Sequence, residues 1–422
     1  MLKKENSLEG VNKVENITKD LCNNEKQCLI KSKNLIEKKV KELRNKTPNI
    51  CFARNKIAEL EVNKFFYKNS IVDRAMIVLR ANGCEHYKKN GGCTMCSHFN
   101  GTDRNVNITT QDYINQWNSV HDCKTKNGEA FNINNYPVVC VYNLGSLLNE
   151  NEISAEAVQY IFNSLNNFQS VEKVIIESRA EYISAKALQN IKDVYKNGIV
   201  EVGIGIESTN VLIREVCHHK GLEDLQLAKQ AIVLLHQFGF KALAYVNFKP
   251  IFLTEQEAIN DAISTIVDCF KMGFDAVSIE PTSLQDYSLA NHLNLLGLYR
   301  VPWLWSLQSI VKGVYDQLQT KTLDIRIGGY FDEEVLSGSQ GEGFCGKNEL
   351  FPHQTSSNCQ HCSPKFIENI KKFNMTYDIK DLNSIEKCPF CYNLWQDACR
   401  VKDSRSIYQR IHDALQCEEN DE

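Results

Sequence analysis

Three cysteines in the first quarter of the chain have the residue type and spacing to bind a metal cluster. Cys84, Cys93 and Cys96 form the pattern C-x8-C-x2-C within the segment GCEHYKKNGGCTMCSHFNG. Three thiolates on one loop can bind three irons of a 4Fe–4S cluster and leave the fourth iron open to another molecule. A structural zinc ion is the alternative, and His86 or His98 would then supply its fourth ligand.

Four cysteines near the end of the chain form a second candidate metal site. Cys359, Cys362, Cys388 and Cys391 have the pattern C-x2-C-x25-C-x2-C, which is typical of four thiolates around one zinc ion. An auxiliary iron–sulfur cluster or free thiols are the alternatives. Four other side chains could each replace one ligand: Cys345, His353, His361 and Cys399. Such a module either binds nucleic acid or fastens the C-terminal region to the rest of the protein.

Composition limits the class of protein that can carry these sites. The chain has 422 residues, of which 43% are hydrophobic and 17 are cysteine. A secreted scaffold held by disulfides would be shorter and would carry an export signal. The N-terminal residues lack an apolar signal segment, and no run of eighteen apolar residues occurs. We therefore expect a cytoplasmic protein without membrane spans, whose cysteines bind metal.

Charge gives a local indication of a polyanionic partner. The net charge is −4, so any nucleic-acid binding must come from a patch rather than from the whole chain. Residues 29–61 carry nine Lys or Arg against four Glu, and the apolar residues at the start of this stretch fall near helical spacing. The stretch is either the solvated face of a surface helix or a contact to a phosphate backbone.

Short apolar runs alternate with amphipathic stretches from residue 70 onward, which predicts an α/β fold with a parallel sheet. The candidate strands are residues 74–80, 138–142, 174–177, 200–206, 241–246 and 276–279. The first cysteine group directly follows the first of these strands, at the sheet edge where such folds place their chemistry. The predicted domains are a polar helical extension (1–69), an α/β core (70–335) and a Cys-rich metal-binding region (336–422).

Segments that follow successive strands resemble the radical S-adenosylmethionine superfamily. NLGSLLNENEI (143–153) corresponds to the Gly-rich segment that binds the methionine amino group, and VEVGIGIEST (200–209) to the segment that contacts the adenosine. VIIESRAEYIS (174–184) lies at the end of the strand between them. The first gap in the cysteine loop is wider than the usual three residues, as in subfamilies related to the Elongator catalytic subunit.

Three further segments narrow the resemblance to the RaSEA family, the archaeosine-forming members of this Elongator-like branch. These segments are HKG (219–221), NFKPIFLTE (247–255) and YRVPWLWS (299–306). Residues 278–282 (SIEPT) depart from the Ile-Asn-Pro-like element of the family. The resemblance implies a partial (β/α)6 TIM-like barrel, with an N-terminal helical extension and a C-terminal zinc-ribbon-like module.

The resemblance also implies which residues bind the cofactors. Cys84, Cys93 and Cys96 would hold the catalytic 4Fe–4S cluster. The S-adenosylmethionine site would be formed by Met95, Gly145, Ser146, Glu177, Arg179, Gly205, Glu207 and Lys249. Zinc would occupy the C-terminal cysteines.

The activity implied by the resemblance starts with reductive cleavage of S-adenosylmethionine to a 5′-deoxyadenosyl radical. The enzyme would be a carbon–nitrogen lyase that acts on a lysine-modified 7-deazaguanine in tRNA and forms archaeosine. It would need an external reductant and a separate lysine-transferring partner protein. Two alternatives stay open: a radical enzyme that modifies a small molecule, amino acid or peptide, and a noncatalytic zinc-bound RNA-binding protein.

Overall fold

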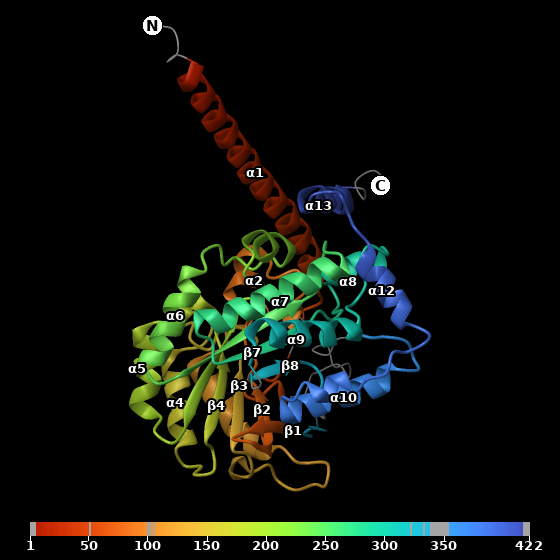
Figure 1. Cartoon of the computed structure of the whole chain (residues 1–422). Helices are drawn as coiled ribbons and strands as arrows, with labels where there is room; N and C mark the ends of the chain where they lie inside the picture. The colour runs from red at the N-terminus through yellow and green to blue at the C-terminus, as the bar shows by residue number, and fades with distance from the viewer. Residues whose placement is uncertain are drawn as a thin grey trace.

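One nine-stranded sheet organises the computed structural model of the chain (Figure 1). The model describes residues 6–49, 52–98, 102, 104, 106–320, 323–331, 334–337 and 354–416, with side chains from residue 25 onward. The strands lie side by side in the order β8-β7-β6-β5-β4-β3-β2-β1-β9, so each strand pairs with its neighbour in sequence except at β9. Strands β2 to β8 pair in parallel, whereas β1 pairs antiparallel with both β2 and β9.

The strands extend the predicted set at both ends of the sheet. Their bounds are β1 Glu59–Tyr67, β2 Ser70–Val78, β3 Val138–Tyr142, β4 Lys173–Glu177, β5 Ile199–Gly205, β6 Lys241–Phe248, β7 Ala276–Pro281, β8 Ile325–Ile327 and β9 Glu334–Val335. The predicted strand at 138–142 has the same bounds as β3, and the predicted α/β fold with a curled half-barrel sheet is confirmed. The sequence pattern does not predict strands β1, β8 and β9.

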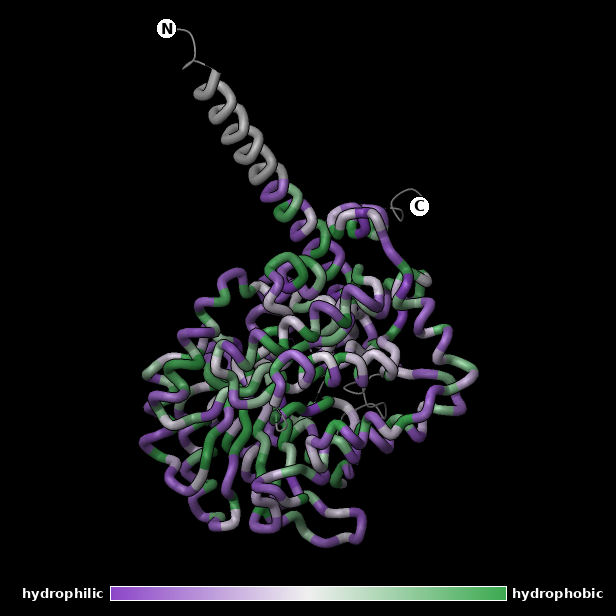
Figure 2. The backbone as a smooth tube through the Cα atoms, viewed as in Figure 1, coloured by the Kyte–Doolittle hydropathy of each residue, from purple (hydrophilic) through white to green (hydrophobic). Residues whose placement is uncertain are grey.

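Helices between the parallel strands cover the convex face of the sheet (Figure 1). They are α3 Thr110–Ser119, α4 Ala155–Leu165, α5 Ala185–Val194, α6 Gln226–Gln237, α7 Glu255–Met272 and α9 Leu304–Leu318. Side-chain caps begin several of them, and α7 begins with a capping box between Thr254 and Glu257. Figure 2 shows hydrophobic residues along the strands and hydrophilic ones on the outer turns.

The concave face of the sheet differs in chemistry from the convex face. In β3, Val139 and Val141 join the large apolar core beneath the helices, whereas Cys140 points to the opposite side with Phe65 and Ile175. The alternation follows from the period of two in a strand. Deep on the concave side, Glu201 pairs with Lys173 (2.6 Å) and Arg326 (2.7 Å), which closes one end of the half-barrel with buried ion pairs.

The long helix α1 (Asn6–Asn45) packs its C-terminal third onto the body of the protein (Figure 1). Ile36, Val40 and Leu43 are buried in a second apolar cluster. The same cluster includes residues of α8 (Leu289–Leu295) and α13 (Ile407–Gln416). The apolar face of α1 therefore packs against the body of the protein next to the cysteine loop.

The described part of the C-terminal region contains the helices α10 Ser363–Thr376, α11 Lys380–Asn383 and α12 Tyr392–Arg400 before α13. The predicted division at residues 69 and 335 stays a prediction, and β1, which precedes residue 70, belongs to the same sheet as the core strands. None of the helices in the described ranges is long and apolar enough to cross a membrane.

Candidate active site and metal centre

The cysteine loop leaves the carboxyl end of β2 and encloses a short helix, α2 (Glu85–Asn90). Cys84 is the N-cap of this helix, and its Sγ accepts a hydrogen bond from the Tyr87 amide at 3.3 Å. Gly91 ends the helix in the left-handed conformation with φ 84°, which a residue with a Cβ rarely adopts. The chain then turns back toward Cys93 and Cys96, so the loop folds around its own backbone.

Arg44, at the end of α1, holds this loop together. Its guanidinium donates to the carbonyl oxygens of Gly91 (2.9 Å), Cys93 (2.9 Å) and Cys96 (2.7 Å). A further bond of 2.5 Å reaches the carbonyl of Tyr287. Burial lowers the pKa of Arg44 to about 10, and the side chain therefore stays charged at neutral pH. The Arg44 guanidinium thus satisfies the backbone carbonyls of Cys93 and Cys96 themselves, as well as that of Gly91 before them.

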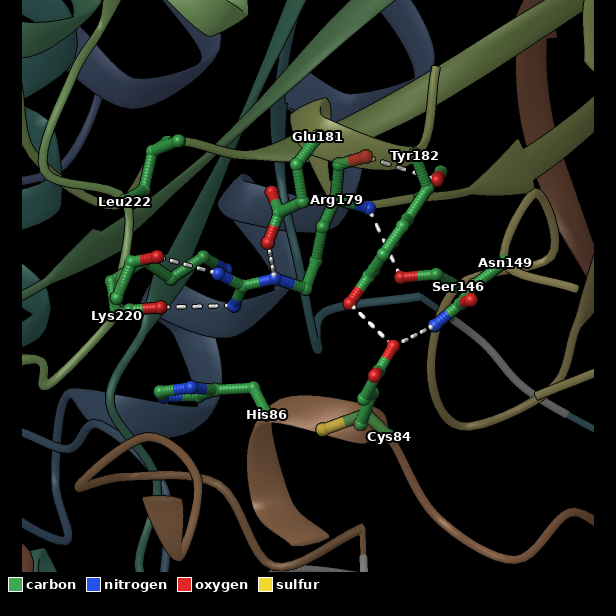
Figure 3. Close-up of polar contacts among 12 residues, drawn as sticks. Cys84, His86, Ser146, Asn149, Arg179, Glu181, Tyr182, Lys220 and Leu222 are labelled. Atoms are coloured by element: carbon green, nitrogen blue, oxygen red, sulfur yellow. Dashed lines mark hydrogen bonds and ion pairs between the residues drawn. The ribbon is translucent and has the colours of Figure 1, made fainter. Parts of the chain in front are cut away.

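The turn at 219–221 is packed against the same loop. His219 Nδ1 lies 2.9 Å from the Gly92 carbonyl, and His86 Nε2 lies 2.7 Å from the His219 carbonyl. Arg179 extends from the end of β4 and donates to the carbonyls of Lys220 and Gly221, both at 2.9 Å (Figure 3). The HKG segment is therefore a structural bridge between β5 and the cysteine loop.

The segment after β3 makes the other wall of the site. Glu152 accepts hydrogen bonds from the amides of Ser146 (2.6 Å) and Glu85 (2.9 Å), which ties the turn to α2. Gly145 is required there, because a Cβ would lie 2.0 Å from Glu152 Oε2 and 3.3 Å from the Cα of Cys84. The Ser146 hydroxyl is buried and accepts a bond from the Arg179 amide at 3.1 Å.

These elements enclose a cavity of about 480 Å³ on the concave side of the sheet. Of the predicted cofactor residues, the cavity is lined by Met95, Gly145, Glu177, Arg179, Gly205 and Glu207, together with Cys93 and Cys96. Cys84 lies behind the turn at Gly145, and Ser146 supports Arg179 from behind the wall. Lys220, which the sequence does not predict as a cofactor residue, also lines the cavity and pairs with Glu207 at 2.7 Å.

Lys249, like Ser146, is a predicted cofactor residue that does not line the cavity. Its ammonium lies 2.7 Å from Glu255 and donates to the Arg300 carbonyl at 2.8 Å. Glu255 in turn accepts from the Trp303 amide (3.1 Å) and the Ser306 hydroxyl (2.5 Å). The two segments 247–255 and 299–306 therefore bind each other, and a cofactor contact of Lys249 stays a prediction that this geometry does not support.

The three thiols of the cysteine loop differ in pKa. Burial raises the pKa of Cys84 to about 12 and that of Cys93 to about 11. Burial also disfavours the Cys96 thiolate, but the positive charge of His98 outweighs it and lowers the pKa of Cys96 to about 7. Since thiolates are the forms that bind metal, iron must displace protons from Cys84 and Cys93.

The site fits a 4Fe–4S cluster with S-adenosylmethionine beside it. Three thiols come from one loop, and the cavity next to them contains a glycine, Gly205, where a Cβ would lie 2.2 Å from Lys220 Nζ. Within the described residues, these cysteines and the neighbouring histidines do not form a group with ligand atoms all within 4.8 Å. Three thiolates from one loop suit a cluster in which each thiolate binds a separate iron.

The C-terminal cysteines do form a compact group. Their Sγ atoms lie 3.7 Å apart for Cys359 and Cys362, and 3.5 Å apart for both Cys359–Cys388 and Cys362–Cys391. Tetrahedral bonds of about 2.3 Å place thiolates about 3.8 Å apart, so one metal ion fits. Cys362 and Cys391 precede α10 and α12, whose N-terminal dipoles favour thiolates. Of the alternative ligands, Cys345 and His353 lie outside the described residues.

The metal centre is joined to the half-barrel through Trp305. This indole is buried, donates to Cys391 Sγ at 3.4 Å, and meets Phe366 edge-on at 5.0 Å between ring centroids. Trp395 donates to the Ser306 hydroxyl at 2.9 Å. The segment 299–306 therefore connects the ion pair of Lys249 and Glu255 to the four cysteines.

Comparison with known proteins places this architecture in a family. The chain is 31% identical over 358 residues to MJ0550 of Methanocaldococcus jannaschii, which covers 84% of this chain and 90% of that protein. The chain belongs to the same family as that protein. Archaeosine synthase subunit beta of Methanosarcina acetivorans is 27% identical over 78% of this chain and 85% of its own length. The Thermococcus kodakarensis protein of the same name is 27% identical over 76% of this chain and 90% of its own length. No protein-family model matches the chain.

Solved structures similar to this chain include two radical S-adenosylmethionine enzymes. HydG, a maturase of the [FeFe]-hydrogenase, aligns over 94% of this chain and 96% of its own at 11% identity, with a TM-score of 0.40. Methanocaldococcus infernus Elp3 aligns over 45% of this chain and 47% of its own at 14% identity, with a TM-score of 0.35. The predicted assignment of the chain as a radical S-adenosylmethionine enzyme is confirmed, and the two relatives called archaeosine synthase subunit beta are named as enzymes.

Sequence reasoning missed the residues that position the cysteine loop. Arg44 is one of nine basic residues in 29–61, and nothing in its spacing indicates that it bonds to carbonyls of residues 91–96. Glu152 and Tyr182 were also missed. The Tyr182 hydroxyl donates to Glu85 at 2.9 Å, and bonds of Lys89, Asn149 and Tyr182 lower the pKa of Glu85 to about 2 (Figure 3).

We expect Arg44→Met to weaken the cysteine loop. The buried carbonyls of Gly91, Cys93 and Cys96 would be left without their donor, and the free energy of unfolding should fall by about 3 kcal/mol. Iron and sulfide per chain after anaerobic reconstitution should fall at least twofold, with the exposed Lys31→Met on the same helix as the control. Full iron loading in Arg44→Met would show that the loop holds its shape without this arginine.

We expect Cys388→Ala to abolish binding of one metal ion per chain and to loosen α10 and α12. Metal analysis and the fluorescence of Trp305 and Trp395 would measure both effects. The matched control is Cys399→Ala, which replaces a cysteine of α12 outside the group of four and should keep the metal. Equal metal content in both variants would contradict the assignment.

Proposed function

We propose that this protein is the radical enzyme that converts a lysine-modified 7-deazaguanine in tRNA to archaeosine by breaking a carbon–nitrogen bond. The similarity to two proteins named archaeosine synthase subunit beta, each along more than three quarters of this chain, carries the proposal. The cavity at the carboxyl end of the parallel strands supports it, since it places a three-cysteine loop beside a polar chamber.

The chain's own residues would bind and orient the reactants. Cys84, Cys93 and Cys96 would hold the cluster, which supplies the electron that cleaves S-adenosylmethionine to the 5′-deoxyadenosyl radical. Glu207, held by Lys220, and the backbone beside Gly205 would orient the adenosine. The half-barrel excludes bulk water from the reacting atoms.

A second cavity supports tRNA as the substrate. This cavity, of about 690 Å³, lies on the outer side of the cysteine loop, between the end of α1 and α2. Its lining contains asparagines and a tyrosine but no Asp or Glu. Four cations also line it: Lys41, Arg44, Lys88 and Arg104. Such a surface suits a phosphodiester backbone. The basic stretch 29–61 would thus contribute a phosphate contact through the end of α1.

Zinc is our proposal for the C-terminal cysteines. Sulfur separations of 3.5–3.7 Å suit one tetrahedral ion, whereas a cluster would bind each thiolate to a different iron. The joint through Trp305 supports a role in fastening the C-terminal helices to the half-barrel.

The name subunit beta of two relatives supports a partner that transfers the lysine.

Anaerobic incubation with S-adenosylmethionine, dithionite and tRNA carrying the lysine-modified base tests the reaction. Nucleoside mass spectrometry should detect archaeosine, and Cys96→Ala should lower its formation by at least a hundredfold, because the open-iron cluster no longer forms. The control is Cys28→Ala, which removes an exposed thiol of α1. If 5′-deoxyadenosine forms while the tRNA stays unchanged, the substrate is a small molecule, amino acid or peptide instead.

The basic cavity makes a separate prediction about binding. Replacing Lys41 and Lys88 together by Glu should weaken tRNA binding at least tenfold at 0.1 M salt, and should reduce the salt slope of log K by about 1 for each phosphate that the variant no longer neutralises. Filter binding would measure both, with the exposed Lys186→Glu on α5 as control. An unchanged affinity and slope would place the RNA on another face.

A further inference from the structure

The charged residues that line the active-site cavity fall into two groups. Most are neutralised within the protein: Lys220 by Glu207 (2.7 Å), Arg179 by Glu181 (2.5 Å) and Arg326 by Glu201 (2.7 Å). Glu177 of β4 has no ion-pair partner among the described residues and interacts with the charge of His98. Arg74 of β2 and Glu280 of β7 also belong to the second group. In the part of the chain that the structure describes, neither has an ion-pair partner, although both line the cavity.

Arg74 is held rigidly with its terminal nitrogens available. Its Cζ lies 4.5 Å from the ring centroid of Phe65 and 4.7 Å from that of Phe331. Nε donates to Asn63 Oδ1 at 3.0 Å, which fixes the plane of the guanidinium. The two terminal nitrogens make no hydrogen bond to any described residue. A planar cation of this kind is suited to two parallel bonds with a carboxylate.

Glu280 is fixed on the β7 side of the same cavity. Its Oε1 accepts from the Ser278 hydroxyl at 2.6 Å, and its carboxylate lies over Gly328, where a Cβ would be 2.0 Å from Oε2. Burial raises the pKa of Glu280 to about 7, and the nearby charges of Glu177 and Glu207 act in the same direction. Arg74 acts in the opposite direction, so its charge is felt at Glu280. A cation from a ligand would stabilise this carboxylate.

Arg74 and Glu280 belong to strands near opposite ends of the parallel part of the sheet, β2 and β7. Phe331, which follows β8, covers the guanidinium of Arg74, and Gly328 supports Glu280. Both side chains therefore lie beside residues that follow β8, and the charge of Arg74 acts on Glu280. Leaving two unpaired charges in a partly buried chamber costs free energy, which a ligand of complementary charge recovers.

We propose that Arg74 and Glu280 form a subsite for the zwitterionic end of an α-amino acid, with the carboxylate on Arg74 and the ammonium on Glu280. The proposal rests on the proposed function in one respect, since the lysine carried by the modified base would present this group. Binding both charges would hold the lysine side chain in one orientation in the cavity. The subsite would also distinguish lysine-modified tRNA from tRNA in which the base lacks the amino acid.

Lysine analogues test the subsite independently of the tRNA reaction. Reconstituted enzyme with S-adenosylmethionine would be titrated in a calorimeter with L-lysine, with 1,5-diaminopentane, which lacks the carboxylate, and with 6-aminohexanoate, which lacks the α-ammonium. Wild-type enzyme should bind L-lysine at least tenfold more tightly than either analogue. Arg74→Met should lose the preference over 1,5-diaminopentane, and Glu280→Gln the preference over 6-aminohexanoate.

Controls separate this subsite from folding and from the proposed reaction. Arg400→Met and Glu368→Gln remove exposed charges of α12 and α10 and should keep both preferences. Iron content and affinity for S-adenosylmethionine should be unchanged in Arg74→Met and Glu280→Gln, which excludes a folding defect. If L-lysine fails to bind the wild type, or both variants keep the wild-type preferences, the subsite is wrong. If the preferences change as expected while no archaeosine forms, the subsite stands and the proposed tRNA reaction fails.

Discussion

The contact of Arg44 with the backbone of the cysteine loop is the interaction on which the site depends. A loop that must curl around a metal cluster leaves carbonyl groups without partners in helix or sheet, and buried carbonyls need donors. A guanidinium offers five N–H groups in a rigid plane and can satisfy several carbonyls at once. Because Arg44 lies at the end of α1, the N-terminal helix becomes part of the active-site scaffold.

The same principle explains the turn at 219–221. His219 and His86 exchange contacts with backbone carbonyls on the other side of the loop, and Arg179 joins that turn to the end of β4. The cysteine loop is therefore held from two sides by side chains that bond to its backbone, while its own cysteine side chains stay available to iron. Rigid support of ligands is what a cluster site requires for reproducible chemistry.

Two of the segments that carry the resemblance to the archaeosine-forming branch have a structural role in this geometry. Residues 247–255 and 299–306 meet through Lys249, Glu255 and Ser306, and Trp305 continues the contact to Cys391. These two segments therefore form a joint between the half-barrel and the C-terminal cysteines. Asn247 is the residue of these two segments that lines the active-site cavity, and Arg74 and Glu280, which also line it, lie outside both segments.

The sequence by itself determined the α/β class, most of the parallel strands and the two cysteine groups, because apolar periodicity and ligand spacing are local properties. It also placed Gly145, Glu177, Arg179, Gly205 and Glu207 at strand ends, and parallel strands bring such ends to one edge. Only the tertiary structure decided that Lys249 turns to Glu255 instead of the cavity, that Arg44 bonds to the cysteine loop, and that Arg74 and Glu280 have no ion-pair partner among the described residues. Each of these outcomes depends on how separate segments of the chain pack against one another, and no local pattern encodes which charge meets which.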